Sequence, residues 1–222
     1  MRIEVFVNEP LDSNCYVLER DSHAIVIDPG FVDISSVVGY IAQRALVVDY
    51  IILTHEHIDH VQGVKRLAEQ YGVEVIASAE CIEALADPRL NLSAEYPGVE
   101  PQDYLPARTI AIDSLGGLLV WSGVELRFFA TRGHSAGSIC IATPDVLFSG
   151  DTLIGKIKTY TTAPNSSISE LRNSFETLKK GFSEQCLVYP GHGEPFTLGS
   201  VVPFIDTQIR LLDRKIARLQ QK

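Results

Sequence analysis

Three of the six histidines in this 222-residue chain lie within six positions of one another, beside two carboxylates. Together they form the run Thr54-His55-Glu56-His57-Ile58-Asp59-His60. Neutral imidazole and carboxylate are the side chains that bind zinc and similar divalent metals. A helix cap or a solvated loop would account for Asp59 alone, but not for three histidines in a His-x-His-x-Asp-His pattern. The run therefore predicts a metal site.

The sequence on each side of this run predicts two rigid elements. The apolar residues 50–53 before it are typical of a buried strand, and the apolar spacing over 61–71 predicts a helix that Gly72 ends. We therefore expect the histidines on a loop between a strand and a helix, where a scaffold can hold metal ligands in fixed geometry.

Three later segments share one feature, because each ends a strand-like run with His or Asp among small residues. They are Gly133-His134-Ser135, Gly150-Asp151-Thr152 and Gly191-His192-Gly193. Glycine at these places permits tight turns and close approach of the backbone to a metal. Strand ends that meet at one edge of a sheet would bring all three to one pocket. Each segment alone is weak evidence, whereas all three behind the histidine run form a specific combination.

The composition excludes several classes of protein. A net charge of −9 and a pI near 5.1 argue against nucleic acid as a partner, because phosphate binding needs clustered Lys and Arg. No stretch approaches the roughly 18 apolar residues of a membrane span. Residues 1–7 alternate like a strand and lack the apolar block of a signal peptide, so we expect a cytoplasmic protein.

The cysteines are far apart and form no Cys-x-x-Cys pair. Because each lies in or beside an apolar run, we expect them to be reduced, buried and chemically inert. They are Cys15, Cys81, Cys140 and Cys186.

The remaining pattern predicts an α/β protein with two packed sheets and helices outside, as a single domain over residues 1–222. Strands are expected at 2–8, 14–20, 23–28, 50–53, 73–77, 109–112, 118–121, 124–130, 138–143, 145–149 and 187–189. Helices are expected over 34–45, 61–71 and 79–86, after the capping box Ser167-x-x-Glu170, and from Phe204 to Leu219. Turns are expected at Pro10 and at Gly116-Gly117. The irregular segment 87–106 either borders the site or is a surface excursion.

Taken together, these motifs resemble the metallo-β-lactamase superfamily. Within it they are most similar to the glyoxalase II (hydroxyacylglutathione hydrolase) group and its shorter relatives. Further matching pieces are Asn14-Cys15-Tyr16, Ile27-Asp28-Pro29-Gly30 and Asn91-Leu92-Ser93. The resemblance covers essentially the whole chain and implies an αββα four-layer sandwich.

The resemblance also implies a ligand set for two divalent metal ions. His55, His57 and His134 would hold the first metal. Asp59, His60 and His192 would hold the second, and Asp151 would bridge the two. Asp28 would steady the histidine loop from outside the ligand set. Zinc is the expected metal, with iron or manganese as alternatives.

Such a pair of metals would support hydrolysis. Zinc lowers the pKa of bound water from about 15.7 to about 7, so a metal-bridging hydroxide would attack a thioester, ester or lactone carbonyl. Asp59 would be the catalytic residue that orients the hydroxide and passes a proton to the leaving group. The sequence offers no Gly-x-Ser-x-Gly elbow as an alternative nucleophile. Arg132, Lys156 and Tyr160 are candidates for contact with the substrate.

Some features leave the substrate open. Glyoxalase II enzymes have a C-terminal helical domain that grips glutathione, which the one helix from Phe204 to Leu219 would not supply. Arg132 and Ala136 stand where the family usually has prolines, and 153–160 lacks the usual Gly-Arg pattern. The alternative activity is that of a mononuclear-iron sulfur dioxygenase on the same fold. A nuclease and a non-catalytic binding protein are less well supported, and the oligomeric state is open.

Overall fold

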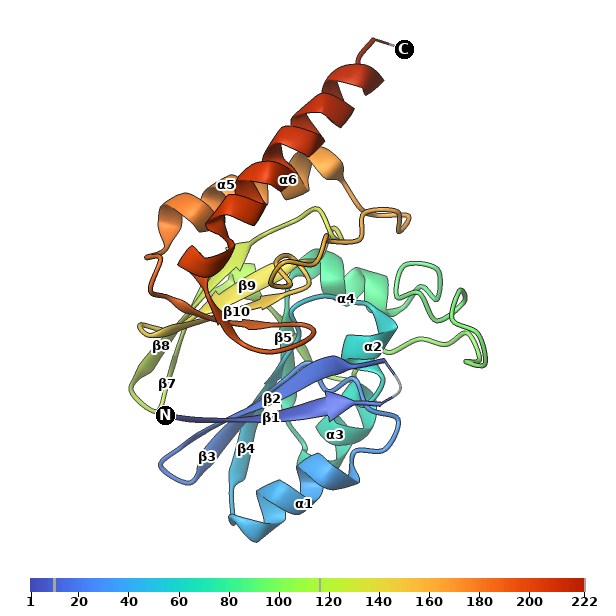
Figure 1. The fold of residues 1–222 in the computed structure, drawn as a ribbon. Coiled ribbons are helices and arrows are strands. Elements are labelled where there is room, and N and C mark those ends of the chain that lie inside the picture. Colours follow the sequence, from blue (N-terminus) through green and yellow to red (C-terminus); the bar gives the residue numbers. More distant parts are fainter. Residues whose placement is uncertain (10, 116, 222) are drawn as a thin grey trace.

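The computed structural model describes residues 1–9, 11–115 and 117–221. Pro10 and Gly116, both expected in turns, lie outside these residues. Two six-stranded sheets pack face to face, and helices cover both outer sides (Figure 1). The layers therefore follow the order helix, sheet, sheet, helix, which confirms the αββα architecture expected from the sequence.

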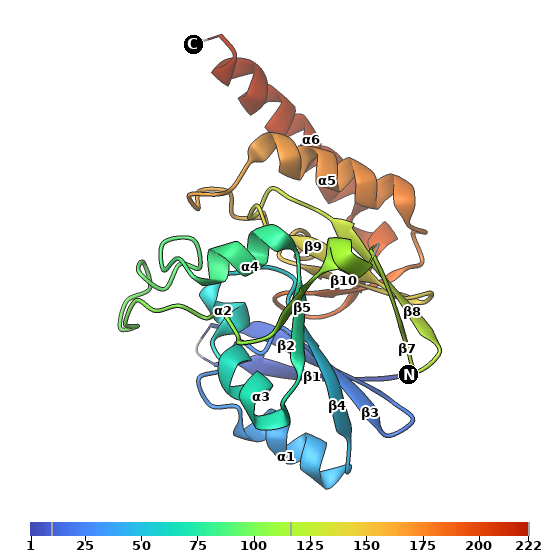
Figure 2. The same cartoon turned by 180° about the vertical axis from the view of Figure 1, so that it is seen from behind.

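The first sheet begins as an antiparallel meander and becomes parallel from its third strand onward. Its strands, in spatial order, are β1 (Arg2–Asn8), β2 (Ser13–Arg20), β3 (His23–Ile27), β4 (Val47–Ile52), β5 (Glu74–Ala77) and β6 (Thr109–Ala111). Helices cover its outer face, as the reverse view shows (Figure 2). They are α1 (Ser35–Gln43), α3 (Val64–Tyr71) and α4 (Ala79–Leu85).

The second sheet has the order β12-β11-β10-β9-β8-β7, and only β10 and β11 are parallel neighbours. Its strands are β7 (Leu118–Trp121), β8 (Val124–Ala130), β9 (Ile139–Ala142), β10 (Val146–Gly150), β11 (Leu187–Pro190) and β12 (Phe196–Thr197). Its outer face is covered by α5 (Ile168–Gly181) and α6 (Leu198–Leu219), and η1 (Ile112–Leu115) links the two sheets.

Alternation along the strands divides the apolar side chains between two faces of each sheet. In β2, Val17 packs under the outer helices, whereas Leu18 packs between the sheets. Between the sheets, the ring of Phe148 lies 5.2 Å from that of Tyr16 and 5.3 Å from that of Tyr189, measured between centroids. Both faces of β3 are thus buried, which explains apolar runs such as 25–27, whereas Val5 and Val7 of the edge strand β1 are exposed.

The expected helix after the histidine run is in fact two helices, α2 (Ile58–Val61) and α3. The amide of Gly63 donates to the carbonyl of Pro29 (2.8 Å) and not back along the helix. The carbonyl of Asp59, the acceptor that a continuous helix would use, instead accepts from the Ser13 hydroxyl (2.5 Å). The prediction of one helix was therefore wrong, and Asp59 and His60 lie within α2.

The last helix begins at Leu198, six positions before the predicted start, and contains Pro203. Its first amides have acceptors outside the helix, because Leu198 donates to the Cys186 carbonyl (2.9 Å) and Gly199 to the Glu184 carbonyl (2.8 Å). These contacts, together with burial of Leu198, start the helix before the proline. The predicted helix start at Ser167 is confirmed, since the Ser167 hydroxyl accepts from the Glu170 amide. The reciprocal half of the capping box does not form, because the Ser167 amide donates to the Gly133 carbonyl (2.9 Å).

All the cysteines are free, as expected, and Cys15, Cys81 and Cys140 are buried while Cys186 is partly buried. None of the helices formed by the described residues is both long and apolar enough to cross a bilayer.

The fold makes a first prediction about stability. Phe148 is fully buried between the sheets, so Phe148→Ala should lower the free energy of unfolding by about 3–5 kcal/mol. Val120 is 64% exposed on β7, so the control Val120→Ala should change it by less than about 0.5 kcal/mol. Urea unfolding followed by circular dichroism measures both, and equal losses in the two variants would contradict this packing.

Candidate metal centre

Strand direction brings the predicted ligands to one edge of the sandwich. β8 and β10 are both antiparallel to β9, and β11 is parallel to β10, so these three strands run the same way. Their carboxyl ends lead to His134, Asp151 and His192. In the other sheet, parallel β3 and β4 pair Ile27 with Ile52, so Asp28 and the histidine run leave that sheet side by side.

The first group of candidate ligands consists of His55, His57 and His134. One nitrogen from each ring lies within 4.8 Å of the others, and all three side chains are buried. The rings stand edge to face, with centroids 4.8 Å apart for His55 and His57 and 4.5 Å apart for His57 and His134. The sequence predicted this trio, and the structure brings it together.

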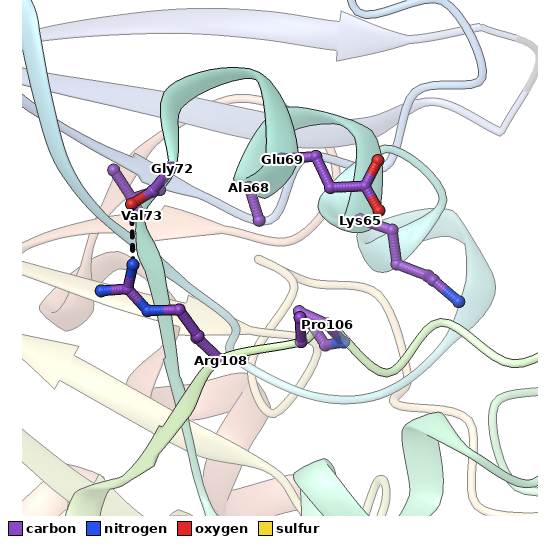
Figure 3. Close-up of a pocket in the computed structure, with 8 residues that line it drawn as sticks. Lys65, Ala68, Glu69, Gly72, Val73, Pro106 and Arg108 are labelled. Atoms are coloured by element: carbon purple, nitrogen blue, oxygen red, sulfur yellow. Dashed lines mark hydrogen bonds between the residues drawn. The ribbon is translucent and has the colours of Figure 1, made fainter.

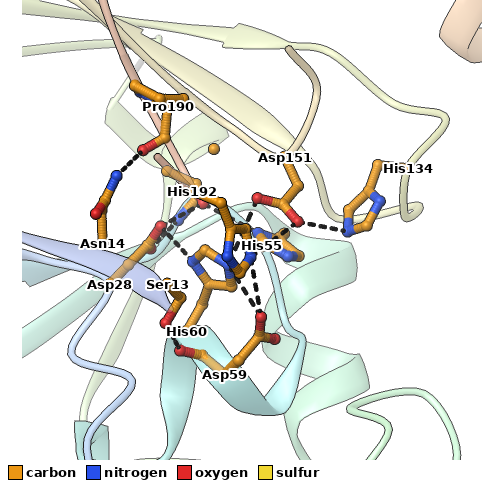
Figure 4. Close-up of polar contacts among 12 residues, drawn as sticks. Ser13, Asn14, Asp28, His55, Asp59, His60, His134, Asp151, Pro190 and His192 are labelled. Atoms are coloured by element: carbon orange, nitrogen blue, oxygen red, sulfur yellow. Dashed lines mark hydrogen bonds and ion pairs between the residues drawn. The ribbon is translucent and has the colours of Figure 1, made fainter. Parts of the chain in front are cut away.

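The second group consists of Asp59, His60 and His192. The Nε2 atom of His192 lies 3.1 Å from Oδ2 of Asp59, and that of His60 lies 3.5 Å from the same oxygen. Asp151 reaches both groups, as Figure 4 shows, with its oxygens 3.6 Å from His60 Nε2 and 3.7 Å from His134 Nε2. All seven predicted ligands therefore converge on one place.

Five of the atoms that face the proposed metals meet a test for a metal site, because the described residues give them no hydrogen bond. The Nε2 atoms of His55, His57, His60 and His134 and Oδ1 of Asp151 are buried without a hydrogen bond to any described residue. Buried polar atoms are normally paired, and each unpaired one is unfavourable by about 1–3 kcal/mol. Divalent cations would satisfy these donor atoms, so the residues fit a metal centre.

The other ring nitrogen of several histidines is held by an oxygen. Nδ1 of His60 lies 3.0 Å from Asp28 Oδ2, that of His134 lies 3.0 Å from the Tyr160 carbonyl, and that of His192 lies 3.0 Å from the Asp12 carbonyl. A carbonyl can only accept, so in His134 and His192 Nδ1 carries the proton. In His134 this leaves the Nε2 lone pair free for a metal, whereas Nε2 of His192 faces Asp59.

Asp28 holds the histidine loop, as the resemblance led us to expect. Its Oδ1 accepts from the Thr54 amide (2.7 Å), and its Oδ2 accepts from the Thr54 hydroxyl (2.6 Å) and faces His60. Asp28 also lies within 4.8 Å of His55 and His60, but its oxygens are already paired. Its backbone φ of 52° is a left-handed conformation that aspartate tolerates, and it turns the carboxylate toward the loop.

The charges differ between the two groups. Burial and the neighbouring imidazoles lower the pKa of His55, and burial lowers that of His134 and brings that of His57 to about 3. These rings are therefore neutral at pH 7, which is the form that binds metals.

In the second group the carboxylates dominate. Burial disfavours charge on His60 and His192, but Asp59 and Asp151 outweigh it and raise their pKa values to about 9 and about 10. The facing imidazoles hold the pKa of both carboxyl groups below the usual range. A cation at this group therefore replaces protons on His60 and His192.

Glu56 ties the two ligand loops together, and sequence reasoning gave it no role. It is fully buried, and its carboxylate accepts from the Ser135 hydroxyl (2.9 Å) and the Asn165 amide (2.5 Å). Burial raises the pKa of this carboxyl to about 6. Because Ser135 follows His134, Glu56 fixes the distance between the histidine run and the His134 loop.

The turn between β1 and β2 forms a second tie, which we call the hairpin clamp (residues 12–14). The Ser13 hydroxyl donates to the Asp59 carbonyl, while the Asn14 amide donates to the Gly191 carbonyl (2.7 Å). The Asn14 side chain donates to the carbonyls of Pro190 (3.0 Å) and Gly193 (2.8 Å). The clamp thus joins Asp59, from one sheet, to the His192 loop of the other (Figure 4).

A cavity of about 370 Å³ opens onto the histidines. Beyond ligands of both groups it is lined by Leu92, Glu95, Tyr96 and Tyr160. The segment 87–106, whose role the sequence left open, therefore borders the site. Of the substrate-contact candidates, only Tyr160 lines this cavity. Lys156 is absent from the lining, and the guanidinium of Arg132 forms an ion pair with Glu80.

A smaller hollow of about 130 Å³ lies elsewhere, between α3 and residues 106–108 (Figure 3). Its wall includes the stems of Lys65 and Glu69, and the Arg108 guanidinium donates to the Gly72 carbonyl (3.2 Å). The described residues that line it include one carboxylate, that of Glu69, and no histidine or cysteine.

Comparisons with known proteins agree with this geometry. The sequence model of the family described as the metallo-β-lactamase superfamily matches residues 8–192, which include every ligand of both groups. The probable metallo-hydrolase YqgX of Bacillus subtilis is 29% identical over 83% of this chain and 86% of its own. Hydroxyacylglutathione hydrolase GloC of Haemophilus influenzae is 27% identical over 90% of this chain and 94% of its own. The crystal structure of the B3 metallo-β-lactamase BLEG-1 matches with a TM-score of 0.82 and 26% identity, over 91% of this chain and 97% of that one.

The unpaired ligand atoms predict stabilisation by metal. Zinc at about 100 times its dissociation constant should raise the free energy of unfolding by about 2.7 kcal/mol over chelator-treated protein. His134→Ala should reduce this gain, whereas the control His23→Ala should keep it, because His23 pairs with Asp49 away from both groups. Urea unfolding with and without zinc measures the gain, and an equal gain in both variants would exclude His134 as a ligand.

The hairpin clamp predicts a selective loss of metal. Ser13→Ala removes the shorter of two hydrogen bonds to the Asp59 carbonyl and leaves only the one from Asn8 Nδ2 (3.3 Å), so Asp59 is held less firmly. Metal at one equivalent per site should then fill the Asp59 group less completely while the His55 group stays filled. Elemental mass spectrometry should then find about one metal per chain in place of about two.

The matched control is Trp121→Phe, which removes another partly buried hydrogen bond, from Trp121 Nε1 to Asp49 (2.7 Å), outside the clamp. This variant should keep the metal content of the unaltered protein. A similar loss of metal in both variants would mean that the clamp acts only through general stability.

Proposed function

This chain belongs to the metallo-β-lactamase superfamily, and we propose that it is a binuclear metal-dependent hydrolase of small-molecule thioesters, esters or lactones. The observation that carries the proposal is the position of Asp151. Its carboxylate lies within 3.7 Å of imidazole nitrogens from both ligand groups, where a bridge between two metals would stand. Seven ligand positions are filled, which favours two metals over one.

The proposed ligands are those of the two groups. His55, His57 and His134 would hold one metal, and Asp59, His60 and His192 the other, with Asp151 shared. We propose zinc, since a set of imidazole nitrogens and carboxylate oxygens suits it, while iron and manganese accept the same donors. Bound divalent metals supply Lewis-acid polarisation of a carbonyl oxygen and lower the pKa of coordinated water.

Asp59 is the proposed catalytic residue of the chain itself. Its side chain is 17% exposed and lines the cavity, and its backbone carbonyl is held by the Ser13 hydroxyl. A carboxylate placed in this way could orient an attacking water, take its proton and deliver that proton to the leaving thiol or alcohol. Tyr160 and Leu92 on the cavity wall would hold the rest of the substrate against the site.

The substrate class rests on chemistry and on the relatives together. GloC of Haemophilus influenzae is a hydroxyacylglutathione hydrolase by name, which supports a thioester substrate for this chain. The cavity of about 370 Å³ suits a small molecule. We therefore place thioesters first, with esters and lactones as the related acyl compounds.

Metal content is the first test of this proposal. Protein purified without chelator should hold about two divalent metal ions per chain by elemental mass spectrometry, and it should cleave members of a thioester, ester and lactone panel. A single iron per chain would favour the mononuclear sulfur dioxygenase in place of the hydrolase. Protein that binds no metal after reconstitution would exclude both enzymes.

Asp59→Asn tests the catalytic carboxylate. The amide keeps the shape but loses basicity, so kcat should fall by about 10²–10⁴-fold with excess metal present. Metal content should be measured on the same sample, because Asp59 is also a proposed ligand. If Asp59→Asn keeps full activity at full metal content, the proposed catalytic role of Asp59 is contradicted.

A further inference from the structure

The cavity wall formed by 87–106 is fixed relative to the ligands by Asn91. This residue is fully buried, and its side chain donates to the carbonyls of Leu85 (3.0 Å) and Gln102 (3.0 Å). Its own carbonyl accepts from the amide of Ile58 (2.9 Å), the first residue of α2. The wall is therefore tied to the helix that carries Asp59 and His60.

A second set of contacts sets the shape of the wall at Leu92. Its backbone has a φ of 65°, which is unfavourable for a leucine and persists only where the surroundings impose it. The Ser93 amide donates to Asn91 Oδ1 (2.9 Å), and the Ser93 hydroxyl pairs with both the carbonyl and the amide of Gln102 (3.1 Å each). This strained, well-anchored turn presents Leu92 and Glu95 to the cavity.

Tyr160 also lines the cavity, and its carbonyl accepts from Nδ1 of His134. The residues Tyr160 and Tyr96 are 52% and 36% exposed, which is high for residues of this size. Two tyrosines and a leucine thus belong to the lining of the cavity. Such surfaces bind flat, apolar groups.

Glu95 is the only charged side chain lining the cavity outside the ligand groups, among the residues that the structure describes. No lysine or arginine contributes to the lining. Glu95 is exposed and forms no ion pair with the described residues. Glu95 therefore adds a carboxylate without an ion-pair partner among the described residues to a lining that includes two tyrosines.

We propose that this cavity selects substrates whose non-reacting end is flat, apolar and either uncharged or cationic, and that Glu95 discriminates against anionic conjugates. The inference rests on the proposed hydrolase function and narrows its substrate class. A leaving group with a free carboxylate, as in a glutathione conjugate, would place its charge beside Glu95 without a cation to receive it. A unit charge about 4 Å from an exposed carboxylate changes affinity by about fivefold.

Binding of matched thiols tests the charge preference without requiring turnover. Three benzyl thiols, with a para trimethylammonium, methyl or carboxylate group, share a head that bound metal accepts and differ only at the far end. Calorimetry on the metal-loaded protein at low salt should give affinities in that order, with about fivefold between the methyl and carboxylate compounds. Added salt should shrink the difference, because exposed charges are screened.

Variants assign the preference to Glu95. Glu95→Gln should bring the three affinities together, and Glu95→Lys should favour the carboxylate compound. The matched control is Glu100→Gln, an exposed glutamate of the same segment that does not line the cavity, and it should leave the order unchanged.

Thioesters of the same thiols separate this inference from the proposed function. If the thiols bind in the expected order but no thioester is cleaved, the hydrolase function is contradicted and the charge preference is supported. Cleavage of all three thioesters, with the carboxylate compound bound as tightly as the others or with no response to Glu95→Gln, would overturn the inference and keep the hydrolase. Failure of every thiol to bind would also overturn it.

Discussion

The structure depends on the place where the two sheets meet at the candidate metal centre. There, imidazole nitrogens and a carboxylate oxygen are buried without hydrogen-bond partners among the described residues. Each such atom is unfavourable by about 1–3 kcal/mol in the absence of a cation, so this arrangement persists only if the rest of the fold enforces it. Three of the histidine rings are held in position by a hydrogen bond at their other nitrogen, Nδ1. Carbonyls hold His134 and His192, and the Asp28 carboxylate holds His60. The metal-facing edges are therefore aligned before any cation binds, and binding needs little rearrangement of the rings.

Two sheets supply the ligands, so their relative position matters as much as the geometry of either one. Face-to-face packing sets the distance between sheets coarsely, through apolar contacts such as Phe148 on Tyr16. Directional hydrogen bonds then fix it at the site, through the hairpin clamp on one side and Glu56 on the other. The same clamp contact takes the Asp59 carbonyl out of helical pairing, so the break between α2 and α3 and the position of Asp59 have one cause.

Periodicity in the sequence was enough to predict the strands other than β12 and most helices, because buried strands and amphipathic helices leave local patterns. It also indicated two packed sheets with helices outside, and the family resemblance supplied the four-layer αββα order. The seven residues that the family resemblance marks as ligands lie together in the structure, and three of them, His134, Asp151 and His192, stand beside glycines at strand ends. Local sequence patterns could not predict hydrogen bonds between side chains that are far apart in the sequence. Glu56 meets Ser135 and Asn165, which lie 79 and 109 positions away, and nothing near Glu56 in the sequence indicates either partner. The early start of α6 similarly depends on carbonyls of a preceding loop.

The proposed metal ligands and the proposed selective wall belong to different parts of this chain, and a backbone hydrogen bond connects them. The ligands stand at strand ends and in α2, where the sheets restrict movement, whereas the selective wall belongs to an irregular segment between α4 and β6. An irregular segment can accept new side chains at its exposed positions without disturbing a core. The hydrogen bond from the Ile58 amide to the Asn91 carbonyl holds the base of the wall to α2. Substitutions at the exposed positions of the wall should therefore leave the ligands on α2 in place. Residues such as Glu95 and Tyr96, beyond that anchor, are thus the positions at which the substrate range can change while the metal centre stays intact.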